Sequence, residues 1–264
     1  ILRIDQLLVE RGLAASRSQA QRLIAAGVQW RTPPGALPTA VVEAVKSSVD
    51  WRTINKNKDE VPSDAEIVLL DDSESKYVSR GGLKLEGALL SSGLSVAGLR
   101  CMDVGQSTGG FTDCLLQHGA AKVHAVDVGT NQLVWKLRND PRVVVKEQFN
   151  ARHMVPEDIG EKVRLAVMDL SFISLTKVLP AVFSVLDDEG SVVCLIKPQF
   201  ELDREDISKG GIVRDPALHE RAVEKIRRFV VDECRREWRG LIASPITGTD
   251  GNQEFLAWIG GELS

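Results

Sequence analysis

Residues 101–119, CMDVGQSTGGFTDCLLQHG, contain two overlapping and incompatible catalytic patterns. From Gly105 to Gly109 the chain reads G-x-S-x-G, which is typical of a sharp turn that exposes a nucleophilic serine. From Asp103 to Gly110 it reads as a glycine-rich loop after an apolar strand, where backbone N–H groups can approach a polar or anionic cofactor. The loop by itself does not decide between hydrolysis and cofactor binding.

The hydrolytic pattern requires several strands before the serine, and an acid and a histidine after it. Ser107 instead follows the first apolar run of its region. The best available completion is Asp169 with His219, but no histidine of the chain stands in a strand-end loop beside an obvious orienting partner. Hydrolysis is therefore disfavoured.

An acidic residue follows the loop at the distance that a nucleoside-containing cofactor requires. Asp127 ends the next apolar run, KVHAVD, about 20 residues further on, where a carboxylate can accept hydrogen bonds from ribose hydroxyls. NAD would use the same geometry. Because the loop is G-x-S-T-G-G and not G-x-G-x-x-G, a dinucleotide is less favoured.

The stretch DVGQSTGGFTDCLL resembles motif I of the S-adenosylmethionine-dependent methyltransferases. On this resemblance the three glycines allow close backbone approach, and Ser107 and Thr108 place hydroxyls near the methionine portion. The implied cofactor-binding residues are Asp103, Gly105, Ser107, Thr108, Gly109, Gly110, Asp127, Asn150 and Asp169.

Four charged residues stand where predicted strands end or a helix begins. Lys84 falls in the first helix of the larger region, Asp169 ends AVMD, Lys197 ends LIK, and Glu254 begins the last strand. Each alone is an ordinary solvated side chain, because acids and lysines are mostly exposed. In this Lys-Asp-Lys-Glu order they resemble the reactive set of the FtsJ-type ribose 2′-O-methyltransferases.

The chemistry of ribose methylation fits such a set. A ribose hydroxyl is a poor nucleophile at neutral pH, so attack on a sulfonium methyl needs its proton removed or its developing charge stabilised. Lys197 could act as the base, favoured by burial or by the cation Lys84, or as a cationic stabiliser, favoured by Asp169 and Glu254. Both alternatives stay open. We expect Asp169 to orient Lys197, and Glu254 to tether the lysines or the substrate.

Two other classes of methyl acceptor are disfavoured. After Asp169 the chain reads D-L-S-F and not N-P-P-Y or D-P-P-Y, which argues against an exocyclic amine. Cys194 lies inside an apolar strand, so attack on a pyrimidine carbon through a cysteine adduct is also disfavoured.

Hydrophobic patterning indicates the elements that must position these residues. After Leu83, short apolar runs alternate with helical patterns, which predicts a mostly parallel sheet covered on both faces. Ligands of such a sheet bind at the carboxyl ends of its strands. The fold class is α/β, a Rossmann-like methyltransferase fold. The predicted strands are residues 101–104, 122–127, 143–145, 165–169, 192–196, 241–243 and 254–259.

The first 27 residues predict a pair of short helices. Apolar residues recur at helical spacing from Ile4 to Leu8 before Gly12, Ser16 opens a capping-box pattern, and Gly27 is a helix stop. The stretch RIDQLLVERGLAASRSQAQRLIAAG resembles the S-four-type RNA-binding domain, a small α+β fold. The candidate RNA-binding residues are Arg3, Arg11, Arg17 and Arg22.

The segment 31–58 departs from the S-four-type pattern. It contains TPPGALPTA and separates a near-repeat, VQWRT at residue 28 and VDWRT at residue 49. We expect an inserted surface loop there, with some helix at 40–45.

The predicted organisation is two domains and a linker. Residues 1–70 form the RNA-binding domain, 71–82 the linker, and 83–264 the methyltransferase domain.

Composition is that of a globular, cytoplasmic protein: 43% hydrophobic, 27% charged and a net charge of −4, with no signal-peptide or membrane-spanning pattern. The negative net charge gives no evidence for nucleic-acid binding, so that prediction rests on the arginines of the first 27 residues. We expect four reduced, mostly buried thiols and no metal site, because Cys101, Cys114, Cys194 and Cys234 lack metal-ligand spacing.

Over almost the whole chain, the motifs YVSRGGLKLEGAL, DVGQSTGGFTD, MDLSFIS, IKPQFE and GNQEF resemble the TlyA family. That family, often labelled hemolysin A, includes bacterial ribosomal RNA 2′-O-methyltransferases that act on cytidines. The resemblance implies S-adenosylmethionine as cofactor, ribosomal RNA or ribosomal subunits as partner, and no stable membrane association. It also implies that Asn150 lies near the adenine and that the linker couples RNA binding to cofactor binding at 77–82. A pore-forming hemolysin and a non-catalytic RNA-binding assembly factor are the alternatives.

Overall fold

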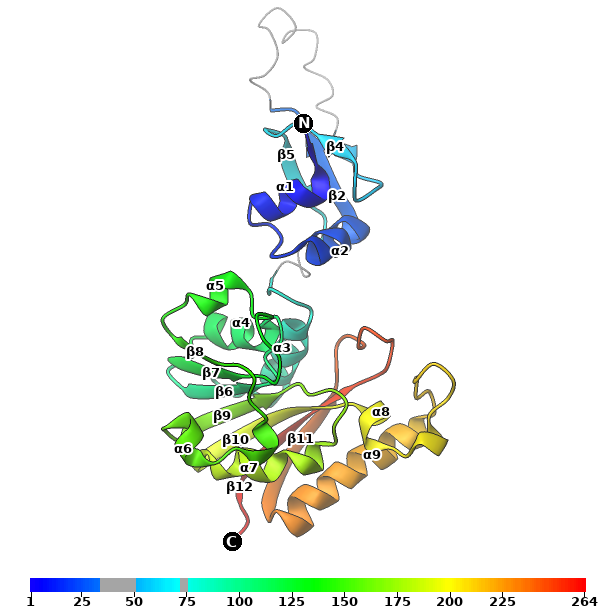
Figure 1. Ribbon diagram of the computed structural model, residues 1–264. Helices are drawn as coiled ribbons and strands as arrows, with labels where there is room; N and C mark the ends of the chain where they lie inside the picture. The colour runs from blue at the N-terminus through cyan, green and yellow to red at the C-terminus, as the bar shows by residue number, and fades with distance from the viewer. Residues whose placement is uncertain (34–50, 72–75) are drawn as a thin grey trace, which may run out of the picture. The chain divides into compact units, whose positions relative to one another are not determined.

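The computed structural model describes residues 1–33, 51–71 and 76–264 (Figure 1). The chain divides into two compact units, Ile1–Ser79 and Arg80–Ser264. The predicted linker 71–82 spans the boundary between these units and stays a prediction, because its residues 72–75 lie outside the described part. No helix in the described ranges is both long and apolar enough to cross a membrane.

The small unit packs two helices against short antiparallel strands. Its helices are α1 (Ile4–Glu10) and α2 (Arg17–Gly27). One sheet pairs β1 (Leu2–Arg3) with β4 (Glu60–Val61), and the other has the order β3 (Arg52–Thr53), β2 (Val28–Arg31), β5 (Glu66–Leu69). The apolar sides of the helices and strands form one core, which includes Ile4, Leu8, Leu23, Val28, Ile54 and Val61.

The predicted start of α2 is confirmed. The Ser16 hydroxyl accepts a hydrogen bond from Gln19 N at 3.2 Å, and the Gln19 side chain accepts one from Ala15 N at 2.6 Å. These contacts satisfy two N–H groups that the helix itself cannot pair. The same Gln19 side chain donates to Tyr77 O at 2.6 Å, which fastens the end of this unit to α2.

The segment 31–58 differs from the expected insertion in its last part. Arg52 pairs with Trp30 across the β2–β3 ladder, and Ile54 is buried in the core. Guanidinium groups also stack on tryptophans from the two halves of the near-repeat, Arg52 on Trp30 and Arg31 on Trp51. The surface-loop prediction is therefore wrong for residues 52–54. The helix predicted at 40–45 lies outside the described residues.

A seven-stranded sheet forms the centre of the large unit, and all seven predicted strands are confirmed. Its order is β11 (Arg236–Ala243), β12 (Phe255–Glu262), β10 (Leu186–Ile196), β9 (Val163–Met168), β6 (Arg100–Val104), β7 (Lys122–Val126), β8 (Val143–Lys146). Neighbours from β10 to β8 are parallel, whereas β12 is antiparallel to both β10 and β11. The strand order reverses between β6 and β9, which is where such sheets bind ligands.

Helices cover both faces of this sheet (Figure 1). Helices α3 (Gly81–Ser92) and α4 (Gly110–Gln117) lie on one face, and α7 (Leu179–Ser184) and α9 (Pro216–Arg228) lie on the other. Short helices complete the connections: α5 (Trp135–Arg138), α6 (Pro156–Ile159) and α8 (Pro198–Glu201), the 3-10 turns Ala151–His153, Leu175–Lys177 and Arg204–Asp206, and a π-helical turn, Phe229–Glu233.

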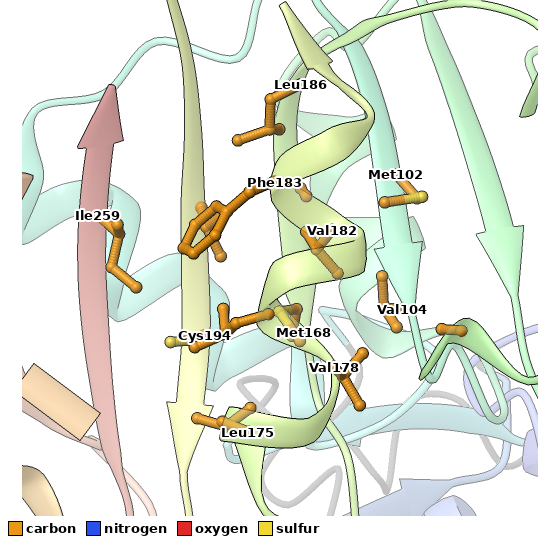
Figure 2. Packing of buried hydrophobic residues seen from close by; sticks show 14 of the residues in the cluster. Met102, Val104, Met168, Leu175, Val178, Val182, Phe183, Leu186, Cys194 and Ile259 are labelled. Carbon is orange, nitrogen blue, oxygen red and sulfur yellow. The ribbon is translucent and has the colours of Figure 1, made fainter. Parts of the chain in front are cut away.

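The core under α7 explains the apolar strands. Val182 and Phe183 face Met102, Met168 and Cys194 from β6, β9 and β10 (Figure 2). All four cysteines are free, and only Cys234 is not buried. Burial raises the pKa of the Cys194 thiol to about 12, so it stays protonated.

Candidate active site

The glycine-rich loop connects β6 to α4 at the reversal of strand order. Gly105 has φ +84°, and a Cβ there would lie 2.3 Å from Asp169 O on the neighbouring strand end. Such an approach excludes every side chain, because real Cβ atoms do not come so close to a backbone oxygen. Gly109, at φ +110°, makes the last turn before the helix. The loop therefore needs glycine for its path, as the cofactor-binding pattern predicts.

Asp127 lies at the end of β7 beside this loop. Its carboxylate accepts hydrogen bonds from Ser107 N at 3.0 Å and Gly129 N at 2.7 Å. Each oxygen of an ionised carboxylate has a second lone pair, so Asp127 retains two acceptor positions. Ribose hydroxyls at this carboxylate stay a prediction, and the site offers acceptors for them.

Asp103 is fully buried below the loop and does not line its surface. Oδ2 accepts from Thr112 Oγ1 of α4 at 2.7 Å, whereas Oδ1 has no partner among the described residues. Burial, opposed by the Thr112 hydrogen bond, raises the pKa of Asp103 to about 7. The structure thus gives Asp103 the position of a support for the loop and for the start of α4.

Lys84 and Glu254 form a buried ion pair. Lys84 Nζ, from α3, lies 2.6 Å from Glu254 Oε1 and 3.3 Å from Oε2. The side chains are 10% and 2% exposed, so the pair is largely screened from water and each charge depends on the other. Removing either partner would leave a buried charge.

Lys197 and Asp169 form a second ion pair. Lys197 Nζ lies 2.7 Å from Asp169 Oδ1 and donates to Ser171 Oγ at 3.0 Å. The lysine side chain is 12% exposed and the aspartate 27%, so this pair is more exposed to solvent than the Lys84–Glu254 pair. Ser171, which sequence reasoning did not single out, belongs to the same D-L-S-F strand end.

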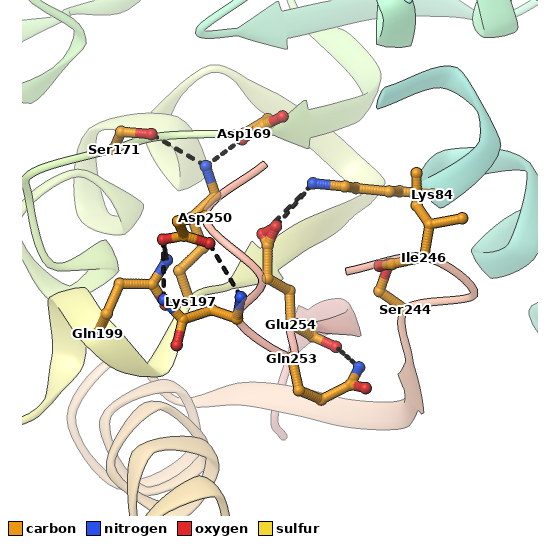
Figure 3. A network of polar contacts seen from close by, with 11 residues as sticks. Lys84, Asp169, Ser171, Lys197, Gln199, Ser244, Ile246, Asp250, Gln253 and Glu254 are labelled. Carbon is orange, nitrogen blue, oxygen red and sulfur yellow. Dashed lines mark hydrogen bonds and ion pairs between the residues drawn. The ribbon is translucent and has the colours of Figure 1, made fainter. Parts of the chain in front are cut away.

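Strand register brings the two pairs together. Ile196 of β10 pairs with Phe255 of β12, so Lys197 and Glu254 occupy the next positions on adjacent antiparallel strands. Met168 of β9 pairs with Cys194 of β10 and Val104 of β6, which brings Asp169 to the same edge as Gly105. Figure 3 shows the four charged side chains in one region, as two separate ion pairs. Glu254 is paired with Lys84, and Asp169 with Lys197.

A loop between β11 and β12 supplies two further polar side chains that the sequence did not predict, Asn252 and Asp250, and Gln199 of α8 contacts Asp250. Asn252 is fully buried, accepts from Val213 N at 2.8 Å and donates to Gly211 O at 2.9 Å. It also donates its side-chain and backbone N–H groups to Asp250. Desolvation opposes the shift, but these hydrogen bonds hold the pKa of Asp250 below its usual value. Gln199 donates to Asp250 at 3.2 Å.

The only sequence signal for this loop is the motif GNQEF, in which Asn252 stands two residues before Glu254. Gly248 also lies in the loop: a Cβ there would be 2.9 Å from both Asp250 Oδ1 and Glu254 Oε1. A side chain at position 248 would therefore have to displace both carboxylates.

Other predicted residues have local partners. Asn150 is exposed and its side chain accepts from Arg152 N at 3.1 Å, where it caps a 3-10 turn. In the small unit, Arg3 pairs with the buried Asp5, and Arg11 donates to Ser63 O and Ala65 O. Arg17 is exposed and Arg22 is half-buried. Arg3 and Arg11 thus also hold the small unit together.

The structure does not bring Ser107, His219 and Asp169 together as a hydrolytic triad. His219 Nε2 lies 2.8 Å from Val213 O and its ring contacts Phe255, whereas Asp169 is paired with Lys197. Ser107 has φ +47°, and its backbone N–H is held by Asp127. The described residues also contain no cluster of three or more metal-binding side chains.

Comparison with known proteins agrees with this geometry. The FtsJ-like methyltransferase family model matches residues 77–261, and the S4 domain model matches residues 2–27. A 16S/23S rRNA (cytidine-2′-O)-methyltransferase TlyA of Mycobacterium tuberculosis is 45% identical over 257 residues, which cover 97% of this chain and 89% of the relative.

Two further relatives carry a hemolysin name. Hemolysin A of Brachyspira hyodysenteriae is 44% identical, over 97% of this chain and 98% of the relative. A solved hemolysin-type structure from Streptococcus thermophilus is 43% identical and has a TM-score of 0.73, covering 98% of this chain and 88% of that structure. With its S4 and FtsJ-like domains, the chain belongs to the TlyA family and is a methyltransferase.

Proposed function

We propose that the protein transfers the methyl group of S-adenosylmethionine to the ribose 2′-hydroxyl of a cytidine in ribosomal RNA. The observation that carries this proposal is the pair of lysine–carboxylate contacts, Lys84–Glu254 and Lys197–Asp169, beside a glycine-rich loop at the reversal of strand order. Cytidine as the target comes from the names of relatives. The cytoplasm is the proposed site of action.

The residues present fit the cofactor. The loop from Gly105 to Gly110 offers close backbone approach, and Asp127 keeps free acceptor positions for ribose hydroxyls. When bound, S-adenosylmethionine supplies an electrophilic methyl group. Asn150 is the candidate neighbour of the adenine, although its side chain has a capping role as well.

Lys197 is the candidate activator of the acceptor hydroxyl. Its ammonium has three N–H donors, of which Asp169 and Ser171 accept two, so one is left for the ribose oxygen. Both partners accept hydrogen bonds from the charged amine, which favours stabilisation of the developing alkoxide over proton removal by Lys197. Asp169 then fixes the amine, and the Lys84–Glu254 pair holds the adjacent strand end.

RNA binding is assigned to the small unit, in which the S4 domain model matches the helices that carry the arginines. Arg17 is exposed and forms no ion pair with a described residue, so it is the best single candidate for a phosphate contact.

Methyl transfer to isolated ribosomal RNA from a strain without the gene tests the function, with methylated riboses mapped by nucleotide. Lys197→Ala should lower the single-turnover rate about 100- to 10,000-fold, which is the range for a positioned acid–base or oxyanion-stabilising group. Lys122→Ala is the matched control. Lys122 forms an ion pair with Glu161 at the amino end of β7, whereas Lys197 lies at the carboxyl end of β10. Wild-type turnover by Lys197→Ala, or methylation of a base in place of ribose, would refute the proposal.

Lys197→Arg separates the two roles of the lysine. Arginine keeps the charge but cannot readily accept a proton. Substantial residual activity in Lys197→Arg, with little dependence on pH between 6 and 9, supports an electrostatic stabiliser. Loss of activity as complete as in Lys197→Ala supports a base.

A further inference from the structure

Trp135 is an aromatic side chain that the fold of the large unit leaves in solvent. It is 75% exposed, whereas the other four tryptophans are half-buried. Three of those four lie under a guanidinium group: Trp30, Trp51 and Trp258. Trp135 has no ring or cation contact with any residue in the described ranges.

The helix that carries Trp135 does not need it for packing. Helix α5 and the loop before it bury Leu133 and Leu137, which are 4% and 2% exposed. Arg138 points to Glu147, with which it forms an ion pair. The two leucines and this ion pair hold the helix in place, so the helix would form equally well with a polar residue at position 135. An exposed tryptophan there lowers the solubility of the protein and adds nothing to the stability of the fold.

The loop before α5 attaches this tryptophan to the cofactor-binding edge. Val134 N donates to Thr108 O of the glycine-rich loop at 3.2 Å. The connection from β7 to α5 begins beside Asp127, where Gly129 O accepts a hydrogen bond from Gln148 N at 3.1 Å. Trp135 thus stands next to the loop at the carboxyl ends of β6 and β7, the edge at which Lys197 and Asp169 also lie.

The charge beside Trp135 identifies the kind of partner. Lys136 is exposed and forms no ion pair with a described residue. An exposed aromatic face next to an unpaired cation is the combination that binds unpaired nucleotides, because a base stacks on the ring while the cation attracts the phosphate.

We infer that Trp135 and Lys136 form a docking surface for RNA, on which a nucleotide flanking the methylated ribose stacks. This inference rests on the proposed function, since it is the acceptor RNA that must cross this edge to bring a ribose to Lys197. It adds a contact on the large unit to the arginines of the small one, and it makes Trp135 a residue that positions substrate.

Binding of the full chain to ribosomal RNA isolated from a strain without the gene tests this surface. Trp135→Ala should weaken RNA binding about 5- to 150-fold, the range that corresponds to loss of one base–aromatic stack. Trp135→Phe should recover most of the affinity, since phenylalanine also stacks. Leu90→Ala is the matched control, because Leu90 on α3 is also 75% exposed and should change nothing. Affinity for S-adenosylmethionine should stay within about twofold in all three variants.

Acrylamide quenching of tryptophan fluorescence gives a second readout. The difference between wild type and Trp135→Phe isolates Trp135, which should be quenched readily in free protein and protected by RNA. Shielding before RNA is added would mean that another part of the chain covers the ring, and it overturns the inference, as does wild-type RNA affinity in Trp135→Ala.

Failure of the function is distinguishable from failure of this surface. If wild type binds RNA without methylating it, the proposed function falls, and the binding data still decide the role of Trp135. If wild type does not bind the RNA at all, both are refuted.

Discussion

At the scale of single residues, the site is built from acids whose surroundings differ sharply. Asp127 is half-exposed and accepts two backbone N–H groups, Asp169 is paired with a lysine, and Asp103 is fully buried with one oxygen unpaired. The same side-chain type therefore has three different surroundings, and we propose a different task for each: ribose recognition by Asp127, orientation of Lys197 by Asp169 and support of the loop by Asp103. Each task predicts a different response to mutation.

Asp127→Ala should weaken S-adenosylmethionine binding about 5- to 150-fold, because two hydrogen bonds of about 0.5–1.5 kcal/mol each are lost. Calorimetric titration of the folded variant measures it. Asp140→Ala serves as the control, since Asp140 caps a turn and pairs with Arg142 on the surface. Wild-type affinity in Asp127→Ala would remove Asp127 from the cofactor site.

Asp103 predicts a pH dependence of stability. Its pKa is raised from 3.8 to about 7 in the folded protein, so folding favours the protonated carboxyl. The stabilisation is complete below about pH 4 and is lost as pH rises through about 7, with a slope of up to about 1.4 kcal/mol per pH unit in between. Asp103→Asn cannot ionise, so the free energy of unfolding should lose this slope. Urea denaturation of wild type and variant at pH 5 and pH 7.5 compares the two. An identical pH dependence in both would contradict the raised pKa.

At the scale of elements, the β11–β12 loop matters because it fixes the start of β12. Asn252 joins this loop to the segment that ends at Val213, and Glu254 lies two residues further on. The reactive edge thus depends on a loop–loop contact as well as on the sheet. It is a support that hydrophobic patterning does not reveal.

Asn252→Ala should destabilise the large unit by about 1–3 kcal/mol, because the buried Val213 N–H loses its acceptor. In a unit of this size, the midpoint of thermal unfolding should fall by about 2–4 °C for each kcal/mol. Methyl transfer should fall further than cofactor affinity, since Glu254 moves and the glycine-rich loop does not. Asn139→Ala, at an exposed asparagine after α5, should change neither quantity. A stable variant with full activity would show that the loop does not position Glu254.

At the scale of the whole molecule, our proposals give the phosphate contacts of the arginines to the small unit, and methyl transfer with one further RNA contact to the large unit. The small unit has its own core and its own arginines, and the large unit holds the cofactor loop and the four charged residues. With a net charge of −4, RNA affinity must come from local cations, which makes it sensitive to salt.

Arg17→Ala should therefore lower the slope of log affinity against log salt concentration by about 0.7–0.9, the value for one lost phosphate contact. Affinity for S-adenosylmethionine should not change. Arg100→Ala is the control, because Arg100 is half-exposed and pairs with Glu161 at the amino end of the sheet. An unchanged slope in Arg17→Ala would move the RNA contacts to other cations.

Local patterns in the sequence were sufficient for much of the fold. Alternation of apolar runs predicted every strand of the large sheet, and Ser16 predicted the start of α2, because strand burial and helix capping depend on residues close together in the chain. The same local reasoning failed at 52–54, where Arg52 and Ile54 join a sheet and a core through partners more than twenty positions away.

Residue types and spacing were enough to select the candidate reactive groups: the glycine-rich loop, Asp127, and the order Lys84, Asp169, Lys197, Glu254. How the four charged residues pair became visible only in the folded chain, where Lys84 contacts Glu254, and Lys197 contacts Asp169 and Ser171. The tertiary structure alone buried Asp103, exposed Trp135 and brought Asn252 against the segment 211–213. The physical reason is that residue type and spacing fix which bonds a side chain can make, whereas burial and ion pairing depend on strand register and loop contacts between segments far apart in the chain.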